Sequence, residues 1–405
     1  NVVVGDEAGT AITTGDGNTA IGFEALQAVS TASNNTAVGL SALKANTSGA
    51  QNTALGRLSL DALTEGSANV SLGNAALTAD TLGSYSVAVG NAALGAQNFT
   101  TATDNYNVAV GYNAGHQVTT GIQNTLIGGL AGDALTDADY NVAVGLNALS
   151  TDTLGSRNTA VGTNALATQN FTTATDAYNV AVGTNAGISV TTGVNNTFIG
   201  GLSGDAVTTG TESVALGSNS LSANTEGTAN TALGAYALRN DTLGSRSVAV
   251  GHQALNAQNF TTATSAYNVA VGANAGVSVT TGTFNTLIGG LAGDAITTSG
   301  YNTATGYAAG SGLTTGVENT IAGALAGTAL TDADYNVAMG VQALAADTKG
   351  SKSTAIGTQT LFSQNFTTSH DALNVAVGYQ AGRVITTGLQ NTLVGALAGD
   401  SLTDA

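Results

Sequence analysis

Three histidines are the first residues of this sequence that could do chemistry. They are His116, His252 and His370. An imidazole can act as a general base or a metal ligand, but either role needs partners that converge on one point. The three histidines occupy different positions in the sequence repeat described below, so we interpret them as separate surface residues. Nothing else in the sequence resembles a catalytic set, and we predict that the protein is not an enzyme.

A recurring acidic loop is the second candidate. It contains Asp133, Asp137 and Asp139. Carboxylate oxygens are the ligands that Ca²⁺ prefers in proteins. The loop lacks the alternating carboxylates and the final glutamate of an EF-hand, so we expect a solvated turn. Ca²⁺ held by these three aspartates is the weak alternative, and the sequence suggests no other cofactor.

All of these residues lie in a short repeat that fills the chain. A segment of Asn or Ser, three further residues and Gly occurs 23 times, as at 141–145. The step between copies is 17 residues, except for 21-residue coils at 86–106, 158–178, 247–267 and 353–373. A fixed short period is typical of a stacked solenoid. We expect residues 1–405 to form one continuous domain, an all-β parallel solenoid with about two short strands per coil, whose anchor and tip lie outside it.

The strand segment is apolar on both faces. Counting each coil from its Asn or Ser as position zero, positions one to four are never charged. Successive side chains of a strand point to opposite faces, so one face can line the coil interior and the other needs a partner. We predict that Val144, Val182 and Val250 at position three belong to the core. We predict that the position-two alanines face other chains: Ala143, Ala160, Ala181, Ala249 and Ala270.

A second rule concerns the rest of the coil. Position eight is always Leu or Gly, and wherever it is Gly, position eleven is apolar. Leu149 and Leu255 represent the first kind of coil and Val190 the second. An empty site of leucine size would cost about 2–5 kcal/mol. The exchange of leucine at position eight for an apolar residue at position eleven predicts a dry coil interior. One large aliphatic side chain per coil would fill it, from one position or the other.

Composition excludes several classes of function. The chain has no proline and no cysteine, and only 8 Lys and Arg against a net charge of −17. A nucleic-acid-binding protein needs a basic stripe, which is missing here. No run of about 18 apolar residues is present, so we expect no membrane insertion of this segment.

The four long coils share the sequence Gln-Asn-Phe-Thr-Thr, and Arg157, Arg246, Lys349 and Lys352 lie just before three of them. An aromatic side chain flanked by polar groups can contact a glycan or protein receptor. The alternative, which we favour, is that the phenylalanines point inward and fill a widened coil, while the basic residues pair with nearby aspartates. The phenylalanines are Phe99, Phe171, Phe260 and Phe366.

Thr-Thr-Gly recurs at Thr119, Thr191, Thr280, Thr314 and Thr386. A flat rank of threonines on a solenoid can bind ice or a mineral surface, which is a second class of function. These rows are interrupted, and Thr-Thr before Gly is ordinary turn chemistry. We rank ice binding low.

The repeat resembles the head repeats of trimeric autotransporter adhesins, the YadA-like family, whose strand motif reads Asn-Ser-Val-Ala-Ile-Gly. The segments 18–22, 247–251 and 353–357 are similar to its last five residues. Similar repeats occur in phage-type tail-fibre proteins. The resemblance implies a left-handed β-roll of three parallel chains on the outside of a cell or virion. The 17-residue step is longer than the family's usual coil.

From these observations we expect a homotrimeric segment of an extracellular surface fibre that projects or mediates attachment. Its partners would be two further copies of itself, with a host-cell glycan or surface protein as a further candidate. A virion tail-fibre shaft is the main alternative.

Overall fold

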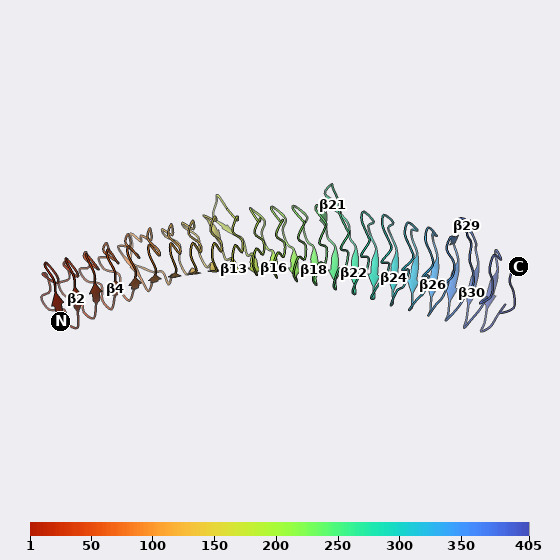
Figure 1. The fold of residues 1–405 in the computed structure, drawn as a ribbon, viewed down its shortest axis with the longest axis horizontal. Helices are drawn as coiled ribbons and strands as arrows, with labels where there is room; N and C mark the ends of the chain where they lie inside the picture. The colour runs from red at the N-terminus through yellow and green to blue at the C-terminus, as the bar shows by residue number, and fades with distance from the viewer. Residues whose placement is uncertain (405) are drawn as a thin grey trace. The chain divides into compact units, whose positions relative to one another are not determined.

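The computed structural model describes residues 1–404 and is an all-β parallel solenoid of about 23 turns, with successive turns about 17 residues apart. Residues 1–404 contain no helix, and therefore none long and apolar enough to cross a membrane. The chain divides into two compact units, Asn1–Gly201 and Leu202–Ala405. In each unit the coils stack side by side, with one strand per coil (Figure 1).

Each coil contributes one three-residue strand to a parallel sheet. The first unit contains β1 Val2–Val4, β2 Thr19–Ile21, β3 Thr36–Val38, β4 Thr53–Leu55, β5 Val70–Leu72, β7 Val87–Val89, β9 Val108–Val110, β10 Thr125–Ile127, β11 Val142–Val144, β13 Thr159–Val161, β15 Val180–Val182 and β16 Thr197–Ile199. The second contains β17 Val214–Leu216, β18 Thr231–Leu233, β20 Val248–Val250, β22 Val269–Val271, β23 Thr286–Ile288, β24 Thr303–Thr305, β25 Thr320–Ala322, β26 Val337–Met339, β28 Thr354–Ile356, β30 Val375–Val377 and β31 Thr392–Val394.

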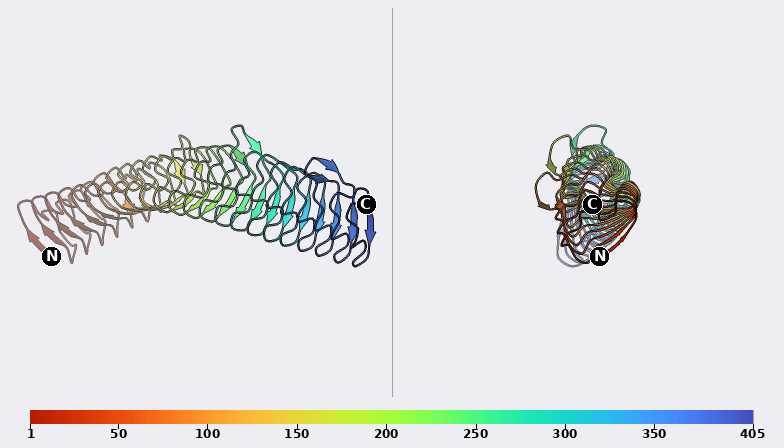
Figure 2. Two further views of the ribbon diagram at one scale, coloured as in Figure 1. Left: turned by 45° about the vertical axis from the view of Figure 1, so that its right-hand side comes forward. Right: turned by 90° about the vertical axis from the view of Figure 1, so that its left-hand side faces the viewer.

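Within residues 1–404, a second strand per coil, expected from the sequence, is present only beside the long coils. There a two-residue strand of the long coil pairs in parallel with one of the preceding coil. These pairs are β6 Gly83–Ser84 with β8 Thr103–Asp104, β12 Gly155–Ser156 with β14 Thr175–Asp176, β19 Gly244–Ser245 with β21 Thr264–Ser265, and β27 Gly350–Ser351 with β29 His370–Asp371. The four extra residues form a bulge, and bulges stand out from the coil outline in Figure 2.

Within each unit the register of the main sheet repeats without a slip. In the first unit, Ala143 of β11 is paired with Leu126 of β10 on one side and with Ala160 of β13 on the other. The glycine after each strand permits this close stacking. At Gly145 φ is 137°, and a Cβ there would lie 2.5 Å from the carbonyl oxygen of Gly162 in the next coil. Any larger residue would collide with backbone.

The asparagine at position zero forms a buried ladder. The Oδ1 of Asn124 accepts a hydrogen bond from the backbone N–H of Asn141 at 2.9 Å, and Nδ2 of Asn141 donates to the carbonyl of Gly155 at 3.0 Å. Each asparagine thus links its own coil to the next one. Because a buried polar group is costly unless it is paired, these bonds explain why the repeat begins with Asn.

The sidedness predicted for the strand was wrong. Ala143, Ala160, Ala181, Ala249 and Ala270 are fully buried inside their own coils, so they cannot face other chains. Position three points outward instead, and Val144, Val182 and Val250 are only half-buried. In coils of the Leu149 kind the interior already holds the position-eight leucine, and position two is always the small Ala or Ser.

Leu149, Leu255 and Val190 are fully buried, as predicted. A Cβ on Gly115 at position eight would meet Val118 of position eleven at 3.4 Å and Leu126 at 2.6 Å. Position two therefore takes part in the same exchange of volume. Long side chains at position two occur where the coil and the one before it both have Gly at position eight: Leu126, Phe198, Leu287, Ile321 and Leu393.

Candidate interaction surface

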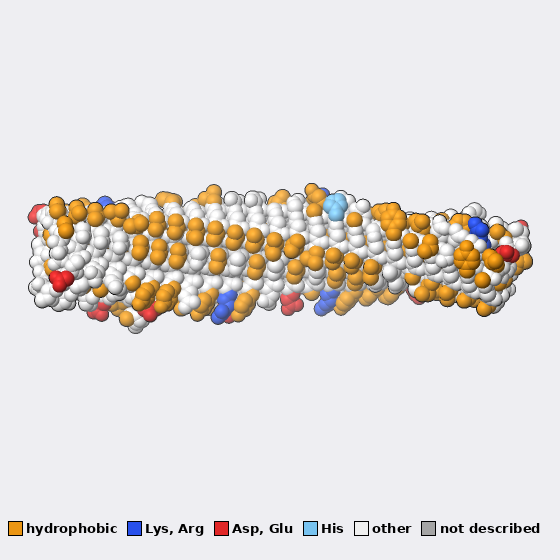
Figure 3. Space-filling model, turned by 90° about the horizontal axis from the view of Figure 1, so that it is seen from below, with side chains coloured by type: hydrophobic (Ala, Val, Ile, Leu, Met, Phe, Trp, Pro, Cys, Tyr) orange, Lys and Arg blue, Asp and Glu red, His pale blue; other side chains and the backbone are white. Residues whose placement is uncertain are grey.

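The outward side of the strands is an apolar face in each unit. Position one is Val or Thr, and position three is aliphatic except at Thr305. These side chains are half-buried or exposed, with 38% of Ile127 and 49% of Leu216 accessible to solvent. Figure 3 shows hydrophobic side chains repeating coil by coil in rows along one face of the molecule. Contiguous apolar surface of this kind marks a contact site in soluble proteins.

An aromatic column runs beside the strand face. It is formed by the residue just before position zero: Tyr85, Tyr106, Tyr140, Arg157, Tyr178, Arg246, Tyr267, Phe284, Tyr301 and Tyr335. Seven of the eleven tyrosines occupy this one place in the coil. All of these residues have φ between 50° and 64°. The sequence analysis missed the column, although aligning the residue that precedes each Asn or Ser would have revealed it.

Neighbouring members of the column stack on one another. The rings of Tyr267 and Phe284 lie 5.6 Å apart at 15°, and those of Phe284 and Tyr301 lie 4.9 Å apart at 11°. In the first unit the Arg157 guanidinium lies 4.7 Å from the Tyr140 ring centre and 5.7 Å from that of Tyr178. The ring faces are thus covered by neighbours, and the ring edges remain exposed.

The bulges are anchored by four equivalent buried aspartates. In the coil before the first long coil, Oδ1 of Asp80 accepts from the backbone N–H of Gly83 at 3.1 Å and from that of Phe99 in the long coil at 3.3 Å. Its Oδ2 accepts from Nε2 of Gln97 at 2.5 Å, and Oε1 of Gln97 accepts from Nδ2 of Asn107 at 2.9 Å. Asp152, Asp241 and Asp347 form the same contacts to the other three long coils.

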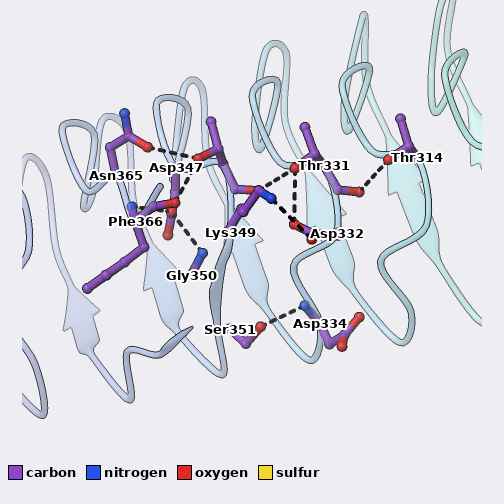
Figure 4. Close-up of polar contacts among 11 residues, drawn as sticks. Thr314, Thr331, Asp332, Asp334, Asp347, Lys349, Gly350, Ser351, Asn365 and Phe366 are labelled. Atoms are coloured by element: carbon purple, nitrogen blue, oxygen red, sulfur yellow. Dashed lines mark hydrogen bonds and ion pairs between the residues drawn. The ribbon is translucent and has the colours of Figure 1, made fainter. Parts of the chain in front are cut away.

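The phenylalanines of the bulges are buried, not displayed. Phe99 is 4% exposed, and Phe171, Phe260 and Phe366 are 6% exposed. Cδ2 of Phe366 lies 2.7 Å from where a Cβ would stand on Gly350, so glycine is required beside it. Figure 4 shows Asp347 between Gly350 and Phe366 at this junction. A receptor contact through these rings is therefore wrong, and the inward alternative is confirmed.

Burial also alters the acidity of two of these aspartates, Asp80 and Asp241. Desolvation raises the pKa of Asp80 and Asp241 above the ordinary value for an aspartate, and the hydrogen bonds from the glutamine side chain and the backbone N–H groups oppose this only in part. Desolvation favours the protonated carboxyl, whereas N–H donors favour the ionised form.

The three aspartates considered for Ca²⁺ do not form a group. Oδ1 of Asp139 accepts from the backbone N–H of Ile122 at 2.8 Å, and Oδ1 of Asp137 accepts from Thr120 at 2.6 Å. The buried Oδ1 of Asp133 has no hydrogen-bond partner within residues 1–404, and desolvation raises the pKa of this carboxyl. Across residues 1–404 no three His, Cys, Asp or Glu side chains are placed to hold a metal ion together.

The basic residues before the long coils pair as expected, with one exception. Arg157 contacts Asp176 at 3.0 Å, Lys349 contacts Asp332 at 3.5 Å and Lys352 contacts Asp371 at 2.6 Å. Arg246 instead donates to Oγ of Ser265 at 2.6 Å. The first threonine of Thr-Thr-Gly forms a separate ladder, in which Thr314 donates to the carbonyl of Thr331 at 3.0 Å (Figure 4). These hydroxyls bond to the next coil rather than forming a free rank for ice.

The histidines remain apart in the structure. Nδ1 of His116 lies 3.2 Å from the carbonyl of Ala92, His252 meets Tyr236 edge-on, and His370 stacks on Phe366. No pocket is present in the described part of the chain. No protein-family model and no curated protein matches this sequence. The extended strand face with its aromatic column is therefore the candidate functional surface.

Proposed function

We propose that this chain is a structural segment of an extracellular surface fibre, in which three parallel copies pack through their strand faces. The observation that supports the proposal is the row of outward aliphatic side chains that repeats along each unit without a partner in the single chain. Burying apolar surface stabilises an assembly by about 25 cal/mol per Å². A face that repeats in every coil adds to this gain with every coil.

Three copies form the simplest closed assembly that the resemblance to YadA-like heads suggests. A face used head to tail either closes into a ring or builds an open filament. In the proposed trimer the chains are left-handed β-rolls, as in that family. The residues at positions one and three, such as Val142 and Val144, would meet the neighbouring chains, in place of the buried alanines.

The aromatic column supports a contact surface for a second reason. Tyrosine and arginine are enriched at protein interfaces, where lysine and glutamate are depleted. The column residue comes two residues before position one in each coil, so the column extends the apolar face on that side. Tyr267 is 47% exposed and Tyr301 is 60% exposed in the single chain. Packing of the neighbouring chain against these ring edges would cover them.

A fibre of this kind would hold an attachment tip away from its base on a cell or a virion. The recurring hydrogen-bond ladders of Asn and Thr resist local opening where they tie one coil to the next. Any receptor binding by this segment would be weak at each site and multiplied by three chains and many coils.

The test is the oligomeric state of two charge variants in one coil. Ile288, at position three, is 39% exposed on the strand face, whereas Thr298 is exposed elsewhere on the same coil. By sedimentation equilibrium, the unaltered chain and Thr298→Glu should be equally stable trimers, and Ile288→Glu should dissociate into folded monomers at a higher protein concentration than either. A circular dichroism spectrum that shows intact β structure is the control for folding. If the unaltered chain stays monomeric at every concentration, the proposal fails.

A further inference from the structure

The four bulges share a second feature that the proposed fibre does not use. Each carries Asn-Phe-Thr, which is the acceptor sequence Asn-x-Ser/Thr for N-linked sugars. We propose that Asn98, Asn170, Asn259 and Asn365 are acceptors for an N-linked sugar on the folded chain. The proposal concerns loops that lie away from the strand face, so it does not depend on the trimer.

Backbone hydrogen bonds hold the start of the acceptor sequence in place. In the third long coil the backbone N–H of Asn259 donates to the carbonyl of Thr280 at 2.9 Å, and that of Phe260 donates to Asp241 at 3.2 Å. The phenylalanine side chain is buried. Asn259 and Thr261, on either side of it, are both exposed to solvent.

The side-chain amide is oriented as well. Oδ1 of each bulge asparagine lies within 2.9 to 3.1 Å of a threonine hydroxyl in the preceding coil. Within residues 1–404, the Nδ2 of these four asparagines has no hydrogen-bond partner. In Figure 4 the Asn365 side-chain nitrogen points away from the other residues drawn. The atom that would receive the sugar is thus the accessible one.

Other acceptor sequences in the chain lack this arrangement. Asn46 and Asn69 are fully buried, and their Nδ2 atoms donate to the carbonyls of Gly49 and Gly83. At Asn240 the amide donates to Asn256, and the hydroxyl of Thr242 is used by the neighbouring bulge. The acceptor sequences at 34–36 and 195–197 end on the strand face. At the bulges, by contrast, an asparagine Nδ2 and a threonine hydroxyl that are unpaired within residues 1–404 belong to the same acceptor sequence and lie away from the strand face.

The reaction joins the anomeric carbon of a sugar diphosphate donor to Nδ2. The C–N bond forms as the bond from the anomeric carbon to the phosphate oxygen breaks. The diphosphate leaves with the bonding electron pair, and the amide nitrogen loses one proton. A separate glycosyltransferase catalyses the step, and the donor is either a nucleoside diphosphate sugar or a lipid diphosphate sugar.

The experiment uses the folded full chain purified from a host that adds no sugar. One sample receives a soluble N-glycosyltransferase with UDP-glucose, and a second receives a membrane oligosaccharyltransferase with a lipid diphosphate sugar. Peptide mass mapping should find sugar on the four bulge asparagines in at least one sample, and none on Asn46 or Asn69. The two samples distinguish the donors. Absence of sugar from all four bulges in both samples overturns the proposal, as does equal occupancy of the buried sites.

A matched pair of variants checks that the bulge sequence itself is recognised. The side chains of Thr261 and Thr262 are both exposed, and neither forms a hydrogen bond within residues 1–404. Thr261→Ala removes the hydroxyl of the acceptor sequence and should abolish sugar at Asn259 while leaving the other three sites unchanged. Thr262→Ala should leave all four sites occupied. If Thr261→Ala leaves Asn259 occupied, the sugar is not transferred to this acceptor sequence and the inference is wrong.

Discussion

Replacing Leu126 by Ala probes the interior where the exchange of volume is most crowded. Leu126 is fully buried, and its terminal methyl carbons lie 2.6 and 2.7 Å from the points where Cβ atoms would stand on Gly115 and Gly132. One leucine therefore occupies the space beside the position-eight glycines of two coils. Truncating a buried leucine costs about 2–5 kcal/mol, depending on how far the site collapses. Because neither glycine can fill the space, we expect a loss in the upper half of that range.

A second substitution should recover part of this loss. Alone, Gly115→Leu would collide with Leu126, and overpacking costs about 1–3 kcal/mol. Together with Leu126→Ala, the new leucine can use the space that Leu126 leaves, at a backbone φ of 60° that is close to the 52° at which Leu149 occupies position eight. The two losses should therefore not add. We expect a favourable coupling of about 2 kcal/mol, within the range for residues in contact.

The assay must report on single coils, since solenoids open locally and need not unfold in one step. Hydrogen–deuterium exchange with mass spectrometry, on peptides within 107–140, measures the free energy of local opening in the intact chain. Peptides of the second unit are the internal control and should be unchanged. Losses that simply add in the double variant would refute the reasoning, because they would mean that the two positions do not share one space.

Three further predictions concern the long coils. Asp241→Asn should loosen the third bulge, because the new side-chain NH₂ would face the Nε2–H donor of Gln258. Adding Gln258→Glu places an acceptor opposite that NH₂ and should restore the exchange protection of the bulge. Burial raises the pKa of Asp241, so the folded state binds this proton more tightly than the unfolded chain, and the stability it contributes should fall as pH rises from 3.8 through the folded-state pKa. Chemical denaturation across that range should show a shallower slope in Asp241→Asn than in the unaltered chain, where buried Asp80 also contributes to it. Lys352→Ala should leave exchange protection almost unchanged, because its pair with Asp371 is exposed to solvent.

The solenoid and its packed interior could be predicted because both are properties of spacing and volume. The period is visible in the sequence as the regular spacing of Asn or Ser and Gly. The volume exchange is visible because a coil has either a leucine at position eight, as at Leu149, or an apolar residue at position eleven, as at Val190. The choice of strand face could not be made in this way. Ala143 and Val144 are both apolar, and alternation assigns them to opposite sides without saying which side is inside. The decisive fact is the width of the interior, which only the three-dimensional coil reveals.

The hydrogen-bond chemistry of the coil was less accessible to sequence reasoning. Asn at position zero served as a marker of the repeat, but its ladder depends on a carbonyl 14 residues ahead and an N–H in the next coil. Asp and Gln at position eleven, such as Asp80 and Gln97, are likewise buried and paired with each other. Buried polar residues that recur with the period of a solenoid are candidates for such ladders, because an unpaired buried group would be costly in every coil.

The conformational cost of the aromatic column links the fold to the proposed assembly. A residue other than glycine in the left-handed region is destabilised by about 1–2 kcal/mol. Leu149 accepts that cost at φ of 52°, and burial of its side chain, worth about 1.5–3 kcal/mol, offsets it. Tyr267, at φ of 51°, remains half-exposed; it gains the ring stacking on Phe284, about 0.5–1.5 kcal/mol, and the Arg246 guanidinium lies 5.7 Å from its ring centre. Glycine occupies this place at Gly17 with no such cost. These contacts within the single chain offset the cost of the left-handed backbone, and a contact made by the outer ring edges with a neighbouring chain would add to them.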